Sequence, residues 1–283
     1  MALGYVMSFG LFTTVALLLA LRLGKRLFAP AHSVARDLAD DNVARRLLSV
    51  GQVLAVFLVA ASAVRNCLEG NSLLSDVAWV ACFAFSGLAL VAVTGRLGTG
   101  LLLRAQLGRE IERGNAASGL AAGAHYVATG IITSRALSGH SLRELGLSLG
   151  FFVLAQVTLH VFVMLFRALT TYDDAEQIRG ENLAAALSYA GVTIAIAIII
   201  ARALEGDFEG LLISLKGYGA VLLFLFALYP IRQLVVQGVL LGGPISLRGG
   251  RLDQGIAAER NQGMAALEAV TYLSSALAIS RFL

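Results

Sequence analysis

The sequence predicts an all-α, polytopic transmembrane helix bundle of eight spans, built as two parallel four-helix repeats. Of the 283 residues, 58% are hydrophobic and only 14% are charged, a composition unlike that of a soluble globular domain. Apolar stretches of about 20 residues, the length of a helix that crosses a bilayer, recur between charged clusters. A pattern of Asn, a run of small residues and Arg also returns four times along the chain.

The expected spans are separated by two kinds of connection. The first span has no basic residue ahead of its apolar run, which indicates a retained span rather than a cleaved signal peptide. Connections after the first, third, fifth and seventh spans are long and charged, whereas the others are short. The expected ranges are 3–23, 43–64, 75–95, 116–137, 145–166, 183–204, 211–229 and 262–282.

Basic residues predict the orientation. Most of the 22 Lys and Arg residues lie in the long connections, so the positive-inside rule places these connections in the cytoplasm and both termini outside. The net charge of +4 is modest and lies at the membrane edges. It favours contact with anionic lipid over nucleic-acid binding, so the bilayer is an expected partner and nucleic acid is not.

The even-numbered spans share one template, with Asn at the start and Arg at the far end. Asn115 and Arg135 are 20 positions apart, which is about 30 Å of helix, one hydrocarbon thickness. Asn suits a helix N-cap, and Arg suits a helix C-terminus at an interface, so helix caps and outer-interface anchors are the expected roles. The four caps are Asn42, Asn115, Asn182 and Asn261, and the four anchors are Arg65, Arg135, Arg202 and Arg281.

A longer period indicates a duplication. Gly10 to Asn42 and Gly150 to Asn182 are the same distance apart, which aligns the two halves at an offset of 140. The expected repeats are residues 1–140 and 141–283. Since each contains four spans, both enter the membrane in the same direction, and a pseudo-twofold axis should follow the membrane normal. A pseudo-fourfold arrangement of helical hairpins is also compatible with the pattern.

One motif resembles a known family. The segment Glu110 to Ala117 reads Glu-Ile-x-x-Gly-Asn-x-Ala, and echoes of it open Glu181 to Ala185 and Asn261 to Ala266. It is similar to the YjfL-like bacterial inner-membrane family, known as domain of unknown function 350, here in two tandem copies. The resemblance implies a bacterial inner-membrane protein without an established activity. The family's association with phage-shock-type membrane-remodelling proteins and ligase-like enzymes implies a partner role only by association.

Polar residues at membrane depth are the candidate functional residues. Glu268 stands out, because an acidic side chain about 10 Å inside a span usually faces a cavity or a partner. The alternative for Glu268 is a protonated or paired carboxyl that bonds a neighbouring helix. Small residues crowd the even spans, which should therefore form the inner layer. The full set is Glu268, His125, Gln52, Tyr126, Tyr189, Tyr272, Gln156 and His160, for which interhelical hydrogen bonding is the competing interpretation.

Motifs of common enzymes are missing from the sequence. It contains no phosphate-binding loop, no His-Glu-x-x-His and no nucleophile elbow. The four His lack metal-ligand spacing, and two Cys are too few for a disulfide framework. We therefore expect no metal, no cofactor and no enzymatic activity.

Two functions fit these observations. A membrane scaffold or partner subunit, which recruits a cytoplasmic protein through its charged connections, is favoured by the repeated charged boundaries and the few buried ionisable groups. An ion or small-solute channel or transporter, with a polar path lined by the even-numbered spans, is the alternative. A homo-oligomer is compatible with both, because the duplication suggests that four-span relatives pair.

Overall fold

The computed structural model describes the chain except residues 1–2, 29–33, 40, 104–106, 207 and 247. Every regular element in the described part is a helix, which confirms the all-α prediction. The helices are α1 (Leu3–Phe28), α2 (Val34–Ala39), α3 (Val43–Cys67), α4 (Leu73–Leu103), α5 (Leu107–Glu112), α6 (Ala116–Ala136), α7 (Leu142–Ala168), α8 (Asp174–Arg179), α9 (Leu183–Ala203), α10 (Leu211–Leu222), α11 (Leu225–Arg232), the π-helix η1 (Gln233–Leu240), α12 (Arg251–Ala257) and α13 (Gln262–Phe282).

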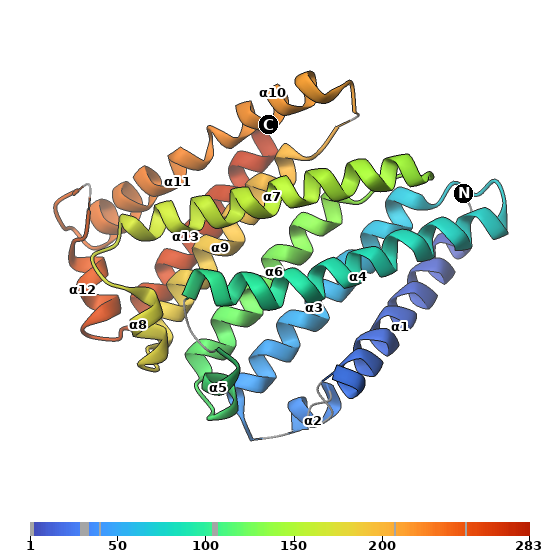
Figure 1. The fold of residues 1–283 in the computed structure, drawn as a ribbon. Helices are drawn as coiled ribbons and strands as arrows, with labels where there is room; N and C mark the ends of the chain where they lie inside the picture. The colour runs from blue at the N-terminus through green and yellow to red at the C-terminus, as the bar shows by residue number, and fades with distance from the viewer. Residues whose placement is uncertain (1–2, 29–33, 40, 104–106, 207, 247) are drawn as a thin grey trace.

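Four long helices form an inner row. Helices α3, α6, α9 and α13, which correspond to the even-numbered spans, lie side by side in that order (Figure 1). Each begins at an Asn and has an Arg in its last turn. Hydrogen bonds join the start of each helix to the segment that leads into the start of the next, so all four point the same way. We call the two ends of this row the asparagine end and the arginine end.

Glycine allows neighbouring helices of the row to pack closely, and we call each contact between two neighbouring inner helices a seam. A Cβ at Gly119 of α6 would collide with the backbone of Ala44 on α3, and Gly51 and Gly123 face each other across the same seam. On the other side of the row, Gly191 of α9 lies against Ala269 of α13. Helices in lipid associate by close backbone approach rather than by a hydrophobic drive, so these small residues explain the tight inner row.

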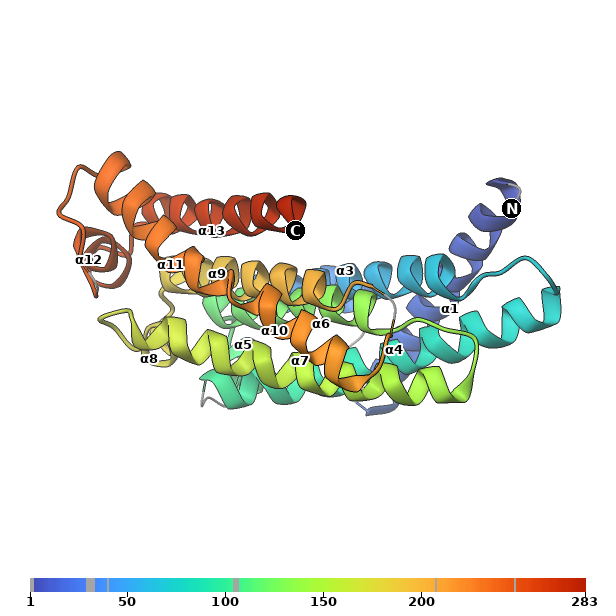
Figure 2. The same cartoon turned by 90° about the horizontal axis from the view of Figure 1, so that it is seen from above.

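The helices of the odd-numbered spans form an outer layer over the grooves of the row (Figure 2). Helix α4 contacts both α3 and α6, and α7 contacts both α6 and α9. Next in order, α10 lies on α9 and α11 lies on α13. Helix α1 contacts α3 and α4 at the opposite end of the row. Two layers of helices therefore result. Helices α6 and α9 lie inside as expected, whereas α13 at the end of the row is no more buried than the outer helix α4.

Seven of the described helical segments are long and apolar enough to cross a membrane. Helix α6, the expected fourth span, has 21 residues but is outside this set, because Gly, Ser, Thr and His dilute its apolar content. It lies between α3 and α9 and beneath α4 and α7, so its neighbours shield it from lipid. A helix in that position can be less apolar than the spans that face lipid.

Two outer helices are longer than the sequence predicted. Helix α4 runs to Leu103 rather than 95, and the seventh span continues past Pro230 to Leu240. Proline lacks an amide hydrogen and disrupts the helical ladder, and the chain here changes to a π-helix. As a result Arg232, which falls in an expected cytoplasmic connection, lies inside the span.

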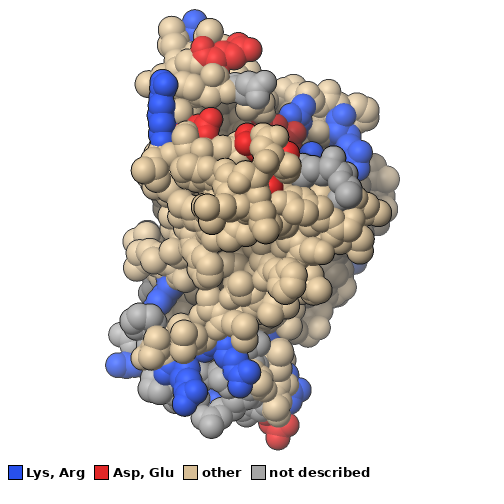
Figure 3. Space-filling model, turned by 90° about the vertical axis from the view of Figure 1, so that its right-hand side faces the viewer, with Lys and Arg blue, Asp and Glu red and all other residues tan. Residues whose placement is uncertain are grey.

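Charge gathers at the two ends of the molecule. On the face in Figure 3, Lys, Arg, Asp and Glu lie mostly at the top and bottom, and a band largely without charge separates them. Such a band suits the hydrocarbon layer of a bilayer, and it agrees with the long apolar helices. The chain is a multi-pass membrane protein.

Candidate functional site

The template asparagines join neighbouring inner helices. Each one caps its own helix, since the side-chain oxygen accepts from an amide of the first turn. The amide nitrogens of Asn42, Asn115 and Asn182 also donate to main-chain carbonyls of the segment that leads into the next inner helix. The acceptors are Ile111 at 2.8 Å, Ile178 at 2.8 Å and Ile256 at 2.9 Å.

Short helices precede the inner helices at the asparagine end. Helices α5, α8 and α12 each lead, through one residue with positive φ, into a cap Asn. These residues are Gly114 (φ 95°), Glu181 (φ 62°) and Arg260 (φ 51°). The turn aims the carbonyl of the short helix at the asparagine of the preceding inner helix. Helices α5, α8 and α12 are therefore hydrogen-bonded parts of the row.

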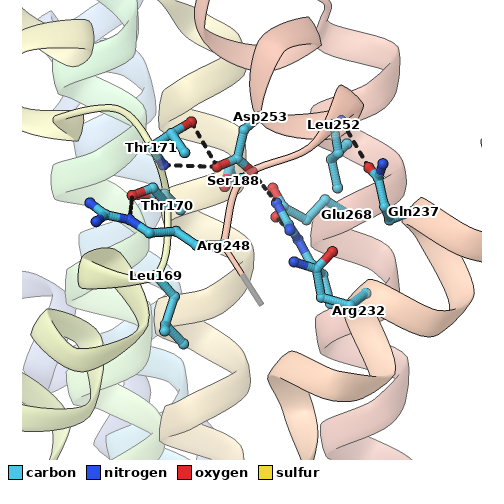
Figure 4. A network of polar contacts seen from close by, with 12 residues as sticks. Leu169, Thr170, Thr171, Ser188, Arg232, Gln237, Arg248, Leu252, Asp253 and Glu268 are labelled. Atoms are coloured by element: carbon cyan, nitrogen blue, oxygen red, sulfur yellow. Dashed lines mark hydrogen bonds and ion pairs between the residues drawn. The ribbon is translucent and has the colours of Figure 1, made fainter. Parts of the chain in front are cut away.

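Three buried charged residues, Arg232, Asp253 and Glu268, lie where α11, α12 and α13 meet. We call these residues, together with the neighbouring Arg167 and Asp174, the arginine cluster. Arg232 donates from Nε to Oε1 of Glu268 at 2.7 Å and from Nη2 to Oδ1 of Asp253 at 2.5 Å (Figure 4). All three side chains are nearly inaccessible to solvent. The other oxygen of Asp253 accepts from the amide and hydroxyl of Thr171, which ties α12 to the end of α7.

Arg167 and Asp174 extend the cluster towards α7 and α8. The two form an ion pair, and the guanidinium of Arg167 lies 5.0 Å from the ring centre of Tyr189. A cavity of about 10 Å³ is lined by Arg167, Glu268 and Tyr272 among others, so it lies beside both parts of the cluster. It is close to the size of one water molecule. In the adjoining connection, burial and then the charge of Glu268 raise the pKa of Tyr172 above its ordinary value.

A glycine-rich loop closes the cluster from the asparagine end. The side chain of Gln237 on η1 accepts from the amide of Leu252 at 3.1 Å, which fixes the start of α12 (Figure 4). Gly250 has φ 116°, and a Cβ there would lie 2.9 Å from Cδ of Gln237. Only glycine allows the loop to adopt that conformation against the glutamine without strain. The loop thereby holds Asp253 beside Arg232.

A second polar group, the histidine cluster, lies between α4, α6 and α7. The rings of His125 and His160 approach edge to face with their centroids 5.4 Å apart. Nδ1 of His160 bonds the main-chain oxygen of Gln156 at 2.6 Å, whereas both ring nitrogens of His125 and the amide of Gln156 have no hydrogen-bond partner among the described residues. Gly98 of α4 faces both rings, so backbone rather than a side chain covers them. These are buried polar groups with unused hydrogen-bonding capacity.

A wide cavity opens at the arginine end. It measures about 470 Å³ and lies between the ends of α6 and α9 and the starts of α7 and α10. Glu205 in its wall bonds both template arginines there, Arg135 at 3.1 Å and Arg202 at 2.9 Å. Phe151, Phe208 and other apolar side chains complete the lining. Arg65 and Arg281, the other two template arginines, are exposed at the same end.

The structure separates the candidate residues into two groups. Glu268, Tyr189 and Tyr272 lie in or beside the arginine cluster, and His125, Gln156 and His160 form the histidine cluster. The remaining two candidates join neither group: Tyr126 packs against Gly95 of α4, and the half-buried Gln52 lies on α3. The residues do not converge, because the inner helices form a row, and equivalent faces meet different outer helices.

Sequence reasoning missed most of the arginine cluster. All four of its other members, Arg167, Asp174, Arg232 and Asp253, lie outside the expected spans, in the long connections. For Arg232 a signal was present, since apolar residues flank it from Leu211 to Leu241 and the apolar run does not stop at Pro230. Asp253 gave no such signal, because its burial depends on a loop that folds back onto the span. Within the described residues, no group of three or more His, Cys, Asp or Glu is arranged to hold a metal ion.

Comparison with known proteins agrees with the duplicated membrane fold. A UPF0719 transmembrane protein of Aquifex aeolicus (strain VF5) is 29% identical over 114 residues, which are 40% of this chain and 42% of that protein. The match thus spans less than half the length of that relative. No solved structure matches the chain. The model of the family described as Domain of Unknown Function (DUF350) matches residues 1–137 and again residues 140–283, so the chain belongs to this family and contains its domain twice.

Proposed function

We propose that the protein is a scaffold of the bacterial inner membrane, with its asparagine end in the cytoplasm and both termini outside. Its role is to hold a soluble protein that has an acidic surface. The observation that carries the proposal is the set of short helices α5, α8 and α12 at the asparagine end, each of which is hydrogen-bonded to the preceding inner helix. A rigid platform of this kind suits recognition, because little conformational entropy is lost when a partner binds.

The charge of the platform supports a partner with an acidic surface. Arginines are exposed along the whole asparagine end, from α1 to the loop before α13. They are Arg22, Arg26, Arg109, Arg113, Arg179, Arg248, Arg251 and Arg260. Complementary charge raises the association rate and selects against partners of like charge. Lysine and arginine at this end also agree with a cytoplasmic location.

Charge reversal at the platform tests the scaffold function. Arg109 and Arg113 are exchanged together for Glu, and Arg104, which lies outside the described residues, can be added as a third site. Proteins captured by cross-linking in intact cells are then quantified against wild type. We expect recovery of a cytoplasmic protein to fall at least severalfold, while Lys at the same sites and Glu at Arg65 and Arg281 leave it unchanged. Equal recovery with the Glu and Lys variants would reject the proposal.

Transport is the second candidate, and a specific observation favours it. The histidine cluster has buried polar atoms without partners, and the cavity of about 470 Å³ at the arginine end offers an entrance from one side. Unpaired polar groups at membrane depth commonly mark a path for ions or protons. Purified protein in liposomes should then show flux that His125→Ala or His160→Ala reduces. Flux that is absent, or equal in these variants, would exclude this candidate.

A further inference from the structure

Three seams of the inner row are fastened by the same hydrogen bond. In each, the side-chain nitrogen of a cap Asn reaches the carbonyl of an isoleucine that lies four or five residues before the next cap Asn. Ile111, Ile178 and Ile256 are all buried, so the apolar side chain at this position is covered each time. The hydrogen bond and the buried isoleucine together define one repeated joint.

At each end of the row, one of the two groups that form this joint has no partner among the described residues. At the α13 end, Asn261 caps its helix, but it is exposed, and its side-chain nitrogen has no acceptor in the described part of the chain. At the α3 end, the residue four positions before Asn42 is Leu38, which is 44% exposed although the three equivalent isoleucines are buried. One end thus has a donor without an acceptor, and the other has an apolar residue without a cover.

The outer layer is also incomplete at the α3 end. Helices α4 and α7 each cover a groove between two inner helices, whereas α1, in the described part of the chain, packs mainly on one inner helix, α3. Its counterpart at an offset of 140 is α7, whose most apolar stretch is 33% buried against 11% for α1. An inner helix placed beside α3 would give α1 the second neighbour that α7 has.

We propose that a second copy of this chain continues the row, with α13 of one protomer beside α3 of the next. Asn261 then donates to the main chain of Leu38 of the partner subunit, as the other cap asparagines do within one chain. Because all inner helices are parallel, both copies have the same orientation in the membrane. The contact joins different surfaces of the two copies, so repetition closes a ring around the membrane normal or extends the row.

The proposed joint is looser than the seams inside one chain. Eight and nine positions after the cap Asn, the internal seams place Gly123 against Gly51 and Ala269 against Gly191. At the ends of the row the corresponding residues are Val50 and Val270, with exposed fractions of 47% and 58%. Two valines keep the backbones further apart than glycine does, so we expect chains to associate reversibly rather than permanently.

Disulfide cross-linking in native membranes tests the joint. In a background with Cys67→Ser and Cys82→Ser, the pair Val50→Cys and Val270→Cys is oxidised under mild conditions. Equivalent positions touch inside the chain, so the two thiols of adjacent protomers should lie within bonding distance. We expect linked dimers and larger species. The matched control combines Val270→Cys with Val153→Cys, since Val153 on α7 is equally exposed at 58% and lies outside the joint.

The asparagine bond has its own variant. Asn261→Asp keeps the oxygen that caps α13 but loses the donor, so the yield of linked species should fall roughly fivefold, as expected for one lost hydrogen bond. Unchanged yield would overturn the role of Asn261. Equal yields from the Val270–Val50 and Val270–Val153 pairs, or purely monomeric protein by native mass spectrometry of lipid nanodiscs, would overturn the contact itself.

Discussion

Removal of Arg232 should destabilise the protein more than any exposed substitution. In Arg232→Leu, the carboxylates of Glu268 and Asp253 lose their shared cation while they stay buried. Breaking a buried ion pair by removal of one partner costs about 3–5 kcal/mol, because an uncompensated charge remains. For a chain of this size the midpoint of thermal unfolding should fall by roughly 6–20 °C.

A double variant separates charge from packing. Arg232→Leu combined with Glu268→Leu removes both charges of one pair and leaves Asp253, which keeps its hydrogen bonds from Thr171. Its loss should be smaller than that of Arg232→Leu alone, since apolar replacement of a whole buried pair is often close to neutral. Arg281→Leu, at an exposed site, serves as the control and should change stability by less than about 0.5 kcal/mol.

Thermal unfolding of detergent-solubilised protein, followed by size-exclusion chromatography with fluorescence detection, measures these differences. Refutation has two forms. Arg232→Leu could unfold within about 2 °C of wild type, which would mean that the charges are not buried together. Alternatively, the double variant could be as unstable as the single one, which would attribute the loss to packing of the arginine and not to unpaired carboxylates.

Three further predictions use the same unfolding assay. Gly119→Ala should destabilise the protein by about 1–3 kcal/mol, because the added Cβ meets the backbone of Ala44. The control Gly100→Ala places its Cβ in open space and should be neutral or slightly stabilising. Equal effects of the two substitutions would contradict the close packing of α3 and α6. Asn182→Ala should lower the free energy of unfolding by about 2–4 kcal/mol, since two amides of the first turn of α9 and the carbonyl of Ile256 lose a hydrogen-bond partner. A decrease below about 0.5 kcal/mol would contradict the role of the joint. Glu205→Gln should cost less than about 1 kcal/mol, because its ion pairs are exposed, and the loss should shrink at high salt.

The sequence predicted the inner row well, because its signals are local. An Asn cap, small residues along one helix and an Arg in the last turn act within about 20 residues, and each follows from the physics of a helix in a bilayer. The direction of the four inner helices and their place behind the outer layer agree with that pattern. The hydrogen bond from each cap Asn to a main-chain carbonyl was not predicted, because that carbonyl lies far along the chain, in the segment before the next inner helix.

The candidate site was harder to predict, because tertiary contacts decide it. Glu268 was identified from its depth, and one of its alternatives, a carboxyl that bonds a neighbouring helix, agrees with the ion pair to Arg232. Its partner was missed because the expected seventh span ends at residue 229, directly before Pro230 and three residues before Arg232. Proline only altered the helix to the π form, and the apolar sequence continued. Hydropathy on both sides of a proline is therefore a better guide to a span's end than the proline itself.

The positions of the buried polar residues also limit the functions that these residues can have. Polar residues at equal depth on four parallel helices would face one lumen if those helices formed a ring, but in a row each faces the outer helix that covers it. His125 accordingly meets α7, and Glu268 meets α11. The arginine cluster then acts as a brace between layers, and its charges are largely neutralised by one another. Any transport would have to follow the boundary between inner and outer helices, and the histidine cluster is the part of that boundary with hydrogen-bonding capacity to spare.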